Sequence, residues 1–317
     1  MADVSVIIPA FNFGRFIGDA IESALSQTQK PAEVIVIDDG STDNTAEIVS
    51  RFADVIYVKQ PNSGVCSARN RGFKISSGQH IAFLDADDIW EPRKLELQIQ
   101  RFLNDKDVGM VHCGMREFDS ETGRTIAFRT DGLDGCIAHE LLLWERPSVN
   151  VSGSAVMVSR EAFELVGGFD TRLKVAEDWD LCYRIALKYK VGFVPEPMVN
   201  YRSHVDGAHL NIREMERGMG LFYEKAFANA DADTLRLRDR AYGNFHRVLA
   251  GSYFKAGDYG AFAKHAAQSV WRRPAGVRYF FEFPFRRIAQ KKLSPAVTPH
   301  VRVHPGDSEH PPTEARR

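Results

Sequence analysis

The stretch that decides the fold reads HIAFLDADDIW and occupies residues 80–90. Its first half is typical of a buried strand, and that strand ends in three carboxylates: Asp85, Asp87 and Asp88. Like charges this close repel one another, and burying them unpaired is costly. In open α/β sheets, ligands bind at the carboxyl ends of the strands. The cluster therefore indicates either a divalent metal shared with substrate phosphates or a solvated turn that caps a following helix.

The surrounding residues predict an α/β sheet. Apolar strands are expected at 4–9, 33–37, 55–58 and 80–84, with helical periodicity between them at about 15–28, 44–52 and 63–75. Strands that alternate with helices form βαβ units with right-handed crossovers. Further strands at 108–113, 154–158, 191–194 and 198–202, a hairpin around 120–124, and helices at 92–103, 137–144, 160–166 and 177–190 follow. The predicted fold is α/β, with a Rossmann-like, mixed but mostly parallel sheet flanked by helices.

Polar residues gather where the expected strands end. Asn12 follows the first strand, Asp38 and Asp39 follow the second, and the acidic cluster follows the fourth. The first loop lacks the dinucleotide-binding glycine pattern, and the chain contains no P-loop motif. Phosphates must therefore be held in another way, and a metal on the aspartates is the available means.

The composition is that of a globular protein rather than that of a nucleic-acid-binding protein or a secreted protein. A net charge of −1 over 317 residues gives no reason to expect nucleic acid as a partner. The four cysteines lie far apart without a Cys-x-x-Cys pair, which argues against a zinc site or a disulfide framework. The first residues lack the layout of a signal peptide, and no apolar run approaches the ~18–20 residues that span a bilayer. We therefore expect a cytoplasmic protein with reduced thiols.

The pattern changes to helices after about residue 206. Helices are expected at 212–227, 233–255 and 258–271. We predict a catalytic domain at 1–205 (nucleotide half 1–113, acceptor half 114–205), a helical region at 206–292 and a disordered tail at 293–317. Residues 271–292 interleave aromatic and basic side chains. This segment fits either a peripheral contact with anionic lipid at the inner face of the membrane or a helix that packs its aromatics on the domain.

Five segments, in this order and spacing, resemble glycosyltransferase family 2, the inverting nucleotide-sugar transferases with the GT-A fold. They are VSVIIPAFN (4–12), IDDGSTD (37–43), NSGVCSARNRG (62–72), FLDADD (83–88), and GGFD through EDWDL (167–181). The resemblance covers residues 4 to about 204. It implies a hexosyltransferase that uses Mg²⁺ or Mn²⁺ and a nucleoside-diphosphate sugar, with a UDP-sugar favoured. The implied acceptor is a glycan or glycolipid, in the synthesis of bacterial cell-surface polysaccharide or glycolipid.

The resemblance also implies roles for individual residues. The nucleotide-sugar site would comprise Pro9, Phe11, Asn12, Asp38, Asp39, Arg69, Asn70, Asp85 and Ala86, with Phe11 against the nucleobase and Asp39 accepting from it. The metal would be held by Asp87, with Asp85 and His204 as further candidates. Asp178 would be the general base. Apart from the resemblance, Glu177, Trp179 and Trp90 are candidates to meet the acceptor, and each of the two tryptophans could equally be a packing residue. With one base and no enzyme nucleophile, a single displacement inverts the anomeric centre.

Three other interpretations stay open from the residues alone. Glu177, Asp178 and Asp180 can act simply as helix caps. The run FLDAD also resembles the Asp-x-Asp of metal-dependent phosphatase-like hydrolases, but those place it on the first strand, whereas here it ends the fourth. A catalytically inactive domain that binds a nucleotide or glycan is the non-enzymatic alternative, although every expected acidic position is filled.

Overall fold

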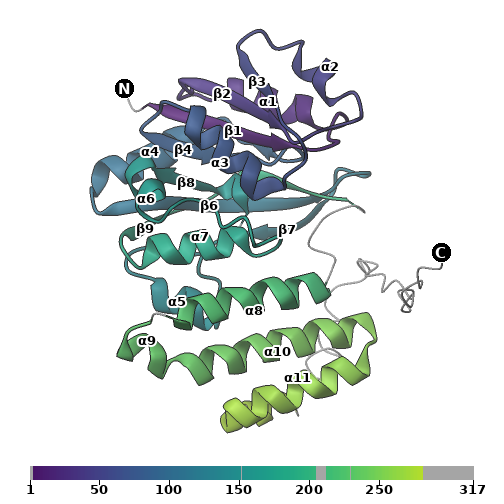
Figure 1. Cartoon of the computed structure of the whole chain (residues 1–317), viewed down its shortest axis with the longest axis vertical. Helices are drawn as coiled ribbons and strands as arrows, with labels where there is room; N and C mark the ends of the chain where they lie inside the picture. The colour runs from purple at the N-terminus through teal and green to yellow at the C-terminus, as the bar shows by residue number, and fades with distance from the viewer. Residues whose placement is uncertain (1–2, 151, 205–211, 229, 281–317) are drawn as a thin grey trace, which may run out of the picture.

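The computed structural model describes residues 3–150, 152–204, 212–228 and 230–280 (Figure 1). Its elements are, in chain order, β1 (Val4–Ala10), α1 (Ile17–Leu25), β2 (Glu33–Asp38), α2 (Thr45–Val49), β3 (Val55–Lys59), α3 (Val65–Ile75), β4 (His80–Phe83), β5 (Ile89–Trp90), α4 (Lys94–Asn104), β6 (Val108–Asp119), β7 (Thr125–Arg129), α5 (Ala138–Leu143), a 3₁₀ turn (Gly153–Ala155), β8 (Val156–Ser159), α6 (Arg160–Leu165), α7 (Glu177–Ala186), β9 (Lys190–Ser203), α8 (Ile212–Ala228), α9 (Ala232–Arg236), α10 (Arg238–Ala256), α11 (Tyr259–Arg272) and a second 3₁₀ turn (Pro274–Gly276).

Within the described residues, nine strands form one sheet in the order β3-β2-β1-β4-β8-β6-β9-β5, with β7 paired to β6. The first four of these strands run parallel, as the alternation of strands and helices predicts. β8 is antiparallel to both of its neighbours, and β6 runs parallel to β9. The sheet is therefore mixed, as expected, and its continuous parallel part is confined to the N-terminal end. There the carboxyl ends of β1, β2 and β4 lie side by side.

Both faces of the sheet are buried at its central strands. In β1, Val4, Val6 and Ile8 enter one core together with residues of α1 and α4. Ile7, which points to the opposite face, packs in a second core with residues of α6 and α7. This period-2 division of a β-branched run is what a doubly covered parallel sheet requires. Because the strands are fixed from both sides, the loops at their carboxyl ends start from a rigid base.

The sequence predicted two short strands where the structure has the single strand β9. The predicted break corresponds to Pro195 and Pro197, where the pairing of β9 with β6 shifts in register around Gly114. A Cβ at Gly114 would lie 2.7 Å from the carbonyl oxygens of Pro195 and Glu196, so the bulge passes against a residue without a side chain. The prolines therefore distort the strand without ending it.

One predicted helix is divided in the structure. The region expected to form a helix at 233–255 contains α9 and α10, which meet at Leu237. The Leu237 N–H bonds to the Thr234 carbonyl, three residues back, so the α-helical ladder is interrupted there. The helix expected at 212–227 and the hairpin around 120–124 are present, as α8 and as the β6–β7 connection.

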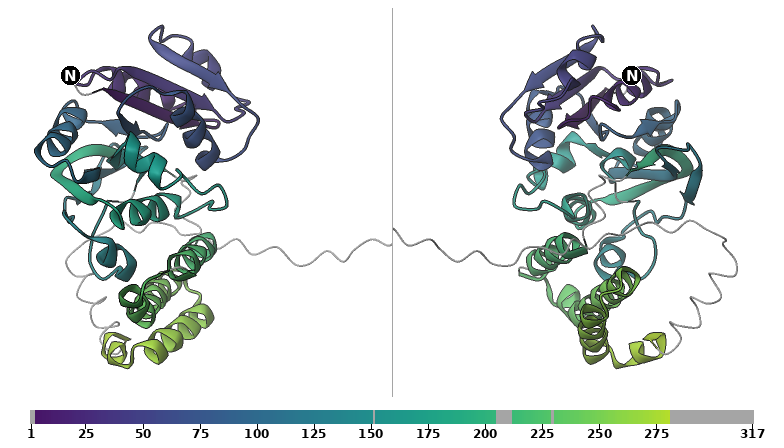
Figure 2. Two further views of the ribbon diagram at one scale, coloured as in Figure 1. Left: turned by 60° about the vertical axis from the view of Figure 1, so that its left-hand side comes forward. Right: turned by 90° about the vertical axis from the view of Figure 1, so that its right-hand side faces the viewer.

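The C-terminal helices extend the core beneath the sheet. Figures 1 and 2 show α8, α10 and α11 stacked on the side of α7 that faces away from β1 and β2. Phe222 and Tyr223 of α8 and Phe245 of α10 belong to the same buried cluster as Ile7 of β1. The predicted division at residue 205 remains a prediction about domains, but hydrophobic packing continues across it.

The predicted lipid contact falls only partly on the described residues. Trp271 is 76% exposed, whereas Arg272 and Arg273 pair with Asp239 and Glu145 of the same chain. Residues 281–292 of this segment, and the predicted tail at 293–317, lie outside the described residues.

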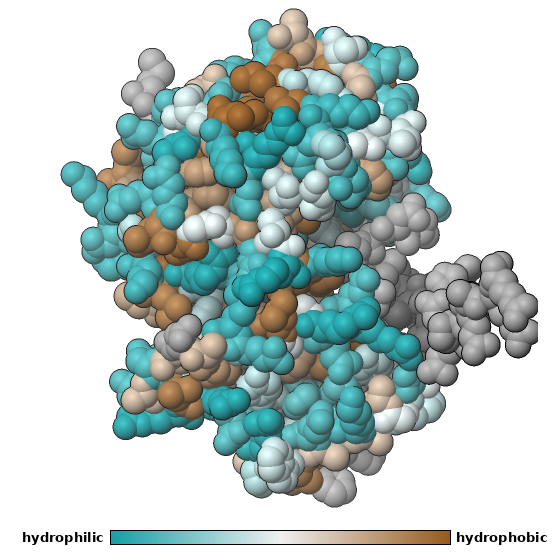
Figure 3. All heavy atoms as spheres, viewed as in Figure 1, coloured by the Kyte–Doolittle hydropathy of each residue, from teal (hydrophilic) through white to brown (hydrophobic). Residues whose placement is uncertain are grey.

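Hydrophobic residues form separate groups among hydrophilic ones on the face in Figure 3. In the parts of the chain that the structure describes, no helix has the length and apolar character needed to cross a membrane. The contact stays a prediction.

One buried charge stands out in the core beneath α4. Lys94 is 0% exposed, and its Nζ donates to Gln98 Oε1 at 2.7 Å and lies 3.9 Å from the centre of the Trp90 ring. Burial lowers the pKa of Lys94 to about 8. The charged form is therefore disfavoured in the folded protein relative to the unfolded chain.

This charge predicts a pH-dependent stability difference. Between pH 8 and 10.5 the unfolded chain keeps a proton on Lys94 that the folded protein has lost. As the pH rises through this range, the free energy of unfolding of wild type should therefore increase by up to about 3 kcal/mol relative to that of Lys94→Met. Urea denaturation across this range measures the difference. Lys255→Met, which removes an exposed lysine, should keep a constant difference from wild type. A constant difference for Lys94→Met as well would show that its pKa is not lowered.

Candidate active site

The loops after β1 and β2 are tied together by polar contacts, some of them buried. Asn12 adopts a positive φ of 59°, and its Oδ1 accepts the Thr42 N–H at 2.8 Å. Asp38 is 0% exposed and accepts from the Ser41 N–H and the Tyr57 hydroxyl. Burial alone would raise the pKa of Asp38, but these hydrogen bonds outweigh it and lower the pKa. Asp38 and Asn12 therefore shape the loops, which is a supporting role rather than an evident ligand contact.

Asp39 joins these loops to the segment before α3. Its Oδ1 accepts from Gln60 Nε2 at 2.6 Å and from the Ser63 N–H at 2.9 Å, and its Oδ2 accepts from the Gly64 N–H at 2.8 Å. Phe11, at the end of β1, is 44% exposed and presents an aromatic surface beside this loop set. An exposed ring beside an anchored carboxylate is the arrangement expected for a nucleobase site.

The three carboxylates after β4 point to different partners. Asp85 Oδ1 lies 2.7 Å from Arg69 Nη2, and Asp87 Oδ2 lies 2.9 Å from His204 Nε2. Asp88 is 1% exposed and accepts from the Ser154 hydroxyl and the Arg202 N–H. Burial raises the pKa of Asp88 well above its ordinary value, and the neighbouring carboxylates add to the rise. Asp85 and Asp87 therefore face the site, while Asp88 anchors the loop in the core.

Arg69, on α3, lies among three carboxylates. Its Nη2 holds Asp85, and its Nη1 lies 3.0 Å from Asp178 Oδ1 and 3.2 Å from Glu177 Oε1. The side chain is only 2% exposed. The resemblance implied that Arg69 lines the phosphates, but its guanidinium is directed at these carboxylates, and a phosphate could reach it only if it moved. It links the acidic loop after β4 to the start of α7.

Asn70 also differs from its expected role. Its Nδ2 donates to the Phe169 carbonyl at 2.8 Å, and its Oδ1 accepts the Phe169 N–H at 2.9 Å. Both ends of the amide are thus used to hold the turn at residues 167–170. Gly168 in that turn has a φ of +71°, and a Cβ there would meet Asn70 Oδ1 at 2.8 Å. Asn70 therefore fixes a turn instead of contacting a nucleotide.

The first turn of α7 presents the predicted base. Ala176, the N-cap, adopts a left-handed conformation with a φ of 68°. Two residues further on, burial raises the pKa of Asp178 to about 7. The Arg69 guanidinium lowers this pKa, whereas repulsion from Glu177 and Asp85 raises it. Asp178 can therefore exchange a proton near neutral pH, which suits a general base better than an ordinary carboxylate does. The surroundings of Asp178 therefore set its pKa as well as its position.

The two tryptophans predicted to meet the acceptor differ in exposure. Trp179 is partly exposed and lies 5.4 Å, centroid to centroid, from Trp144. Trp90 is 3% exposed, donates its indole N–H to the Ser154 carbonyl at 2.9 Å and has Lys94 over its ring. The expectation that Trp90 stacks on an acceptor sugar is therefore wrong, because the ring packs in the core. Pro9 and Ala86 are likewise buried.

The sequence reasoning missed the segment Ser152–Ala155. Ser154 accepts the Asp85 N–H at 3.0 Å while it donates to Asp88. The Gly153 N–H bonds to Asp178, and a Cβ at Gly153 would lie 2.5 Å from Arg69 Nη2. The run of small residues before a strand was the only available signal. It indicates a close approach but does not identify the partner.

Asp87 and His204 fit a divalent metal as part of a shared site. The Asp87 carboxylate is the ligand type that suits Mn²⁺ or Mg²⁺, while the His204 imidazole, 2.9 Å from it, is a nitrogen ligand that Mg²⁺ accepts less readily than a transition metal does; both side chains are partly exposed, at 21% and 12%. Among the residues that the structure describes, no three His, Cys, Asp or Glu side chains are grouped closely enough to hold a metal. Such a metal would need further oxygens from a substrate, as Mg²⁺ sites that bind phosphates commonly do.

Comparisons with known proteins identify the family of this chain. The family model "Glycosyl transferase family 2" matches residues 5–167, just over half of the chain. An uncharacterized glycosyltransferase of Rickettsia prowazekii is 32% identical over 204 residues, which are 63% of this chain and 64% of that protein. The chondroitin synthase of Pasteurella multocida is 31% identical over 187 residues, 58% of this chain and 19% of that protein. The chain thus matches less than two thirds of the length of these relatives.

Two solved structures share the fold at low identity. S. aureus TarS 1-349 in complex with UDP-GlcNAc has a TM-score of 0.59 and 16% identity, covering 86% of this chain and 92% of that one. The mannosyltransferase PcManGT from Pyrobaculum calidifontis, in complex with GDP-Man and Mn²⁺, has a TM-score of 0.58 and 20% identity, covering 92% and 84%. These likenesses support the GT-A architecture. The family model, which matches just over half of the chain, shows that the chain belongs to glycosyl transferase family 2.

Proposed function

We propose that this protein is an inverting glycosyltransferase that moves a sugar from a nucleoside-diphosphate sugar to an acceptor hydroxyl. The observation that carries the proposal is the position of Asp178 at the start of α7, where Arg69 joins it to Asp85 of the Asp-x-Asp loop. A UDP-sugar is the first candidate donor, supported by the TarS complex with UDP-GlcNAc. The GDP-Man complex of PcManGT makes GDP-sugars the second candidate. The family and these relatives favour a transferase over a phosphatase-like hydrolase or an inactive binding domain.

The chain's own residues suit a single displacement. The acceptor hydroxyl oxygen attacks the anomeric carbon as the carbon–oxygen bond to the diphosphate breaks, and the hydroxyl proton passes to Asp178. The diphosphate departs with the bonding electron pair. Phe11 and Asp39 would hold the base, while Asp87 and His204 would hold a divalent cation. Such a cation, when bound, neutralises charge on the departing diphosphate. Because attack and departure take place on opposite faces of the sugar, the anomeric configuration inverts.

The acceptor side is less closely defined. Glu177 and Trp179 flank the base on the first turn of α7, where a glycan or glycolipid hydroxyl would approach. Relatives named chondroitin synthase and hyaluronan synthase support a role in making a cell-surface polysaccharide or glycolipid. We propose that the protein works in the cytoplasm or peripherally at the inner face of the membrane.

The base assignment predicts a donor-specific hydrolysis that depends on Asp178. Wild type with Mn²⁺ or Mg²⁺ should slowly release nucleoside diphosphate from one member of a panel of UDP-, GDP- and dTDP-sugars. Its rate should rise as the pH passes about 7, where Asp178 loses its proton. Asp178→Asn should bind the same donor but turn over about 10²–10⁴-fold more slowly, without this pH dependence. If no donor is hydrolysed and no nucleoside diphosphate binds in calorimetry, the nucleotide-sugar proposal is wrong.

The metal assignment predicts that Asp87 and His204 act together. Asp87→Asn and His204→Ala should each raise the Mn²⁺ concentration for half-maximal UDP binding by at least about tenfold, since even outer-shell changes cost about 10–100-fold in metal affinity. Calorimetric titration of UDP at several Mn²⁺ concentrations measures this shift. Asp134→Asn, an exposed carboxylate paired with Arg101, serves as the control and should leave it unchanged. An unaltered Mn²⁺ requirement in both site variants would exclude them as ligands.

Arg69 predicts a stability effect that depends on the charge of its partners. Arg69→Met leaves three carboxylates facing one another, so the free energy of unfolding at pH 7 should fall by about 3–5 kcal/mol. The loss should be smaller at pH 5, because Asp178, whose pKa burial raises to about 7, is then protonated and repels the other two carboxylates less. Denaturant unfolding at the two pH values measures it. Arg71→Met, on the same helix with only long contacts to Lys59 and Gln60, is the matched control. An equal loss at both pH values would mean that packing, not charge, dominates.

A further inference from the structure

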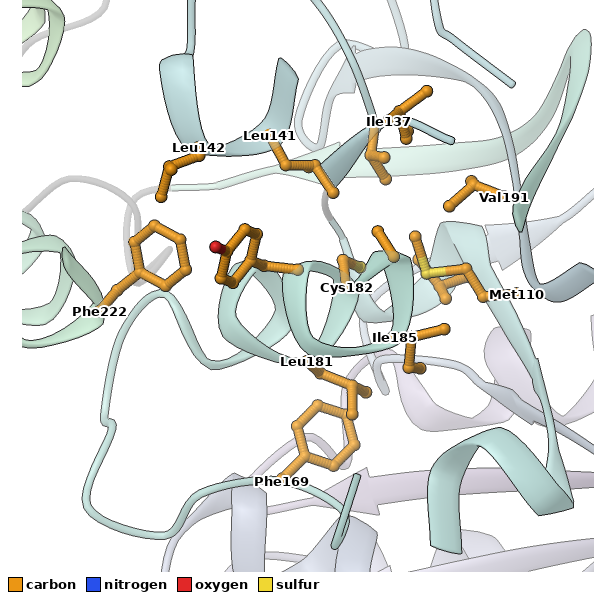
Figure 4. Packing of buried hydrophobic residues seen from close by; sticks show 14 of the residues in the cluster. Met110, Ile137, Leu141, Leu142, Phe169, Leu181, Cys182, Ile185, Val191 and Phe222 are labelled. Atoms are coloured by element: carbon orange, nitrogen blue, oxygen red, sulfur yellow. The ribbon is translucent and has the colours of Figure 1, made fainter. Parts of the chain in front are cut away.

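Helix α8, which lies beyond the stretch matched by the family model, packs directly on the helix that carries the predicted base. Phe222 of α8 is fully buried and meets the Tyr183 ring of α7 edge-on, with centroids 5.4 Å apart. Figure 4 shows Phe222 beside the α7 turns that present Leu181 and Cys182. The next residue, Tyr223, donates its hydroxyl to the Leu142 carbonyl of α5 at 3.0 Å. α8 thus fixes α7 against its neighbours.

Lys225 of α8 joins the two supports of the base. Its Nζ lies 2.6 Å from Asp180 Oδ1, on the first turn of α7, and 2.6 Å from Asp170 Oδ2, at the end of the turn that Asn70 holds. The Lys225 side chain is 22% exposed, and those of Asp170 and Asp180 are 16% and 3% exposed. Asp170 also pairs with Arg172 and Asp180 with Arg184, each at 2.7 Å, so the particular contribution of Lys225 is to join the two carboxylates through short, charge-assisted contacts.

A glycine allows α8 to approach the segment just before the base. A Cβ at Gly218 would lie 2.4 Å from the Val175 carbonyl oxygen. The next residue is Ala176, whose left-handed conformation costs an L-residue about 1–2 kcal/mol. Glycine inside a helix also costs about 1 kcal/mol relative to alanine. At Gly220, on the same helix, an added Cβ would have nothing within 4 Å. Of these two glycines, Gly218 is therefore the one explained by close contact, and its contact is with Val175, the residue before the strained N-cap of α7.

We propose that Lys225 and Gly218 are positioning residues for the transfer reaction: α8 clamps the 170–180 segment and so holds Asp178 toward Arg69 and the Asp-x-Asp loop. The proposal rests on the proposed function, because it assumes that Asp178 is the base. It assigns the C-terminal helices a part in catalysis. Neither residue contacts the reacting atoms, and the donor loops after β1 and β2 lie outside the clamp.

The test compares two pairs of variants on the nucleotide sugar that wild type hydrolyses. Gly218→Ala and Lys225→Met should each lower kcat by about 10–100-fold, since small misplacements of catalytic groups carry costs of that order. The KM for the donor and the calorimetric affinity for UDP with Mn²⁺ should remain those of wild type. Gly220→Ala and Lys255→Met, the matched controls, should retain wild-type kcat. Lys225→Arg should recover much of the loss, because it keeps the charge.

The pH profile separates positioning from a general loss of folded protein. If α8 holds Asp178 in its buried place, Gly218→Ala should move the rise in rate to lower pH, because a base displaced toward water regains a more ordinary pKa. Gly218→Ala leaves every charge in place, so it tests the proposal even if Lys225→Met does not fold. A kcat that falls only in proportion to the folded fraction, with an unchanged pH profile, would overturn the proposal.

A further arm separates this inference from the proposed function. If Asp178→Asn hydrolyses the donor as fast as wild type, the base assignment itself fails. If Asp178→Asn loses turnover while Gly218→Ala and Lys225→Met keep it, the base stands and only the clamp is wrong. An equal rise in the donor KM in both clamp variants would place their effect on donor binding and would also overturn it.

Discussion

The ion cluster around Arg69 is the constraint on which the rest of the site depends. One guanidinium lies within 3.2 Å of carboxylates from two separate parts of the chain, the loop after β4 and the first turn of α7. Buried charges are tolerated only when they are paired and hydrogen-bonded, so these elements must meet in one arrangement. Arginine suits this position better than lysine because its planar fork can hold several carboxylate oxygens in fixed directions. The loop after β4 and the first turn of α7 are thus tied through one side chain.

The sheet explains how so many charges can be gathered at one point. Alternate residues of β1 fill two cores, so the strand ends are fixed from both faces. Small residues then let the charged groups come close: a Cβ at Gly153 would meet Arg69, and Ser154 bridges Asp85 and Asp88. The arrangement leaves more negative than positive charge near Asp178. That excess, together with burial, raises the pKa of Asp178 into the range where a carboxylate can work as a base.

The sequence predicted the parts of this site that are local and missed those that depend on distant packing. Strand ends, acidic clusters and the order of motifs can be read from short stretches, so the positions of Asp39, Asp85 and Asp87 were foreseeable. Asn70 and Phe169 are 99 residues apart, and Arg69 and Asp178 are 109 apart. Nothing in either local stretch states that they meet. Resemblance implied that Arg69 and Asn70 face the nucleotide, and only the packing shows that they face the protein.

Packing across the core also explains two other differences between the sequence-based expectations and the structure. Trp90 was a candidate either to stack on a sugar or to pack, and its ring is covered by Lys94 while its N–H donates to the Ser154 carbonyl. Gly114 shows no local signal for a bulge, but it lets β9 continue through two prolines. Both outcomes are decided by what lies across the core. A sequence pattern reports the preference of a segment, whereas the partner decides its role.

The predicted base lies outside the stretch matched by the family model, on a helix that the C-terminal helices support. The match ends at residue 167, so α7 and its first-turn carboxylates lie beyond it. The buried cluster that supports α7 nevertheless runs from Ile7 in β1 to Tyr253 in α10. Since packing is cooperative within such a cluster, the stability of α8 and α10 and the placement of Asp178 are not independent quantities. A chain that varied its C-terminal helices would therefore also alter the acceptor side of the site, where no residue of those helices needs to touch a substrate.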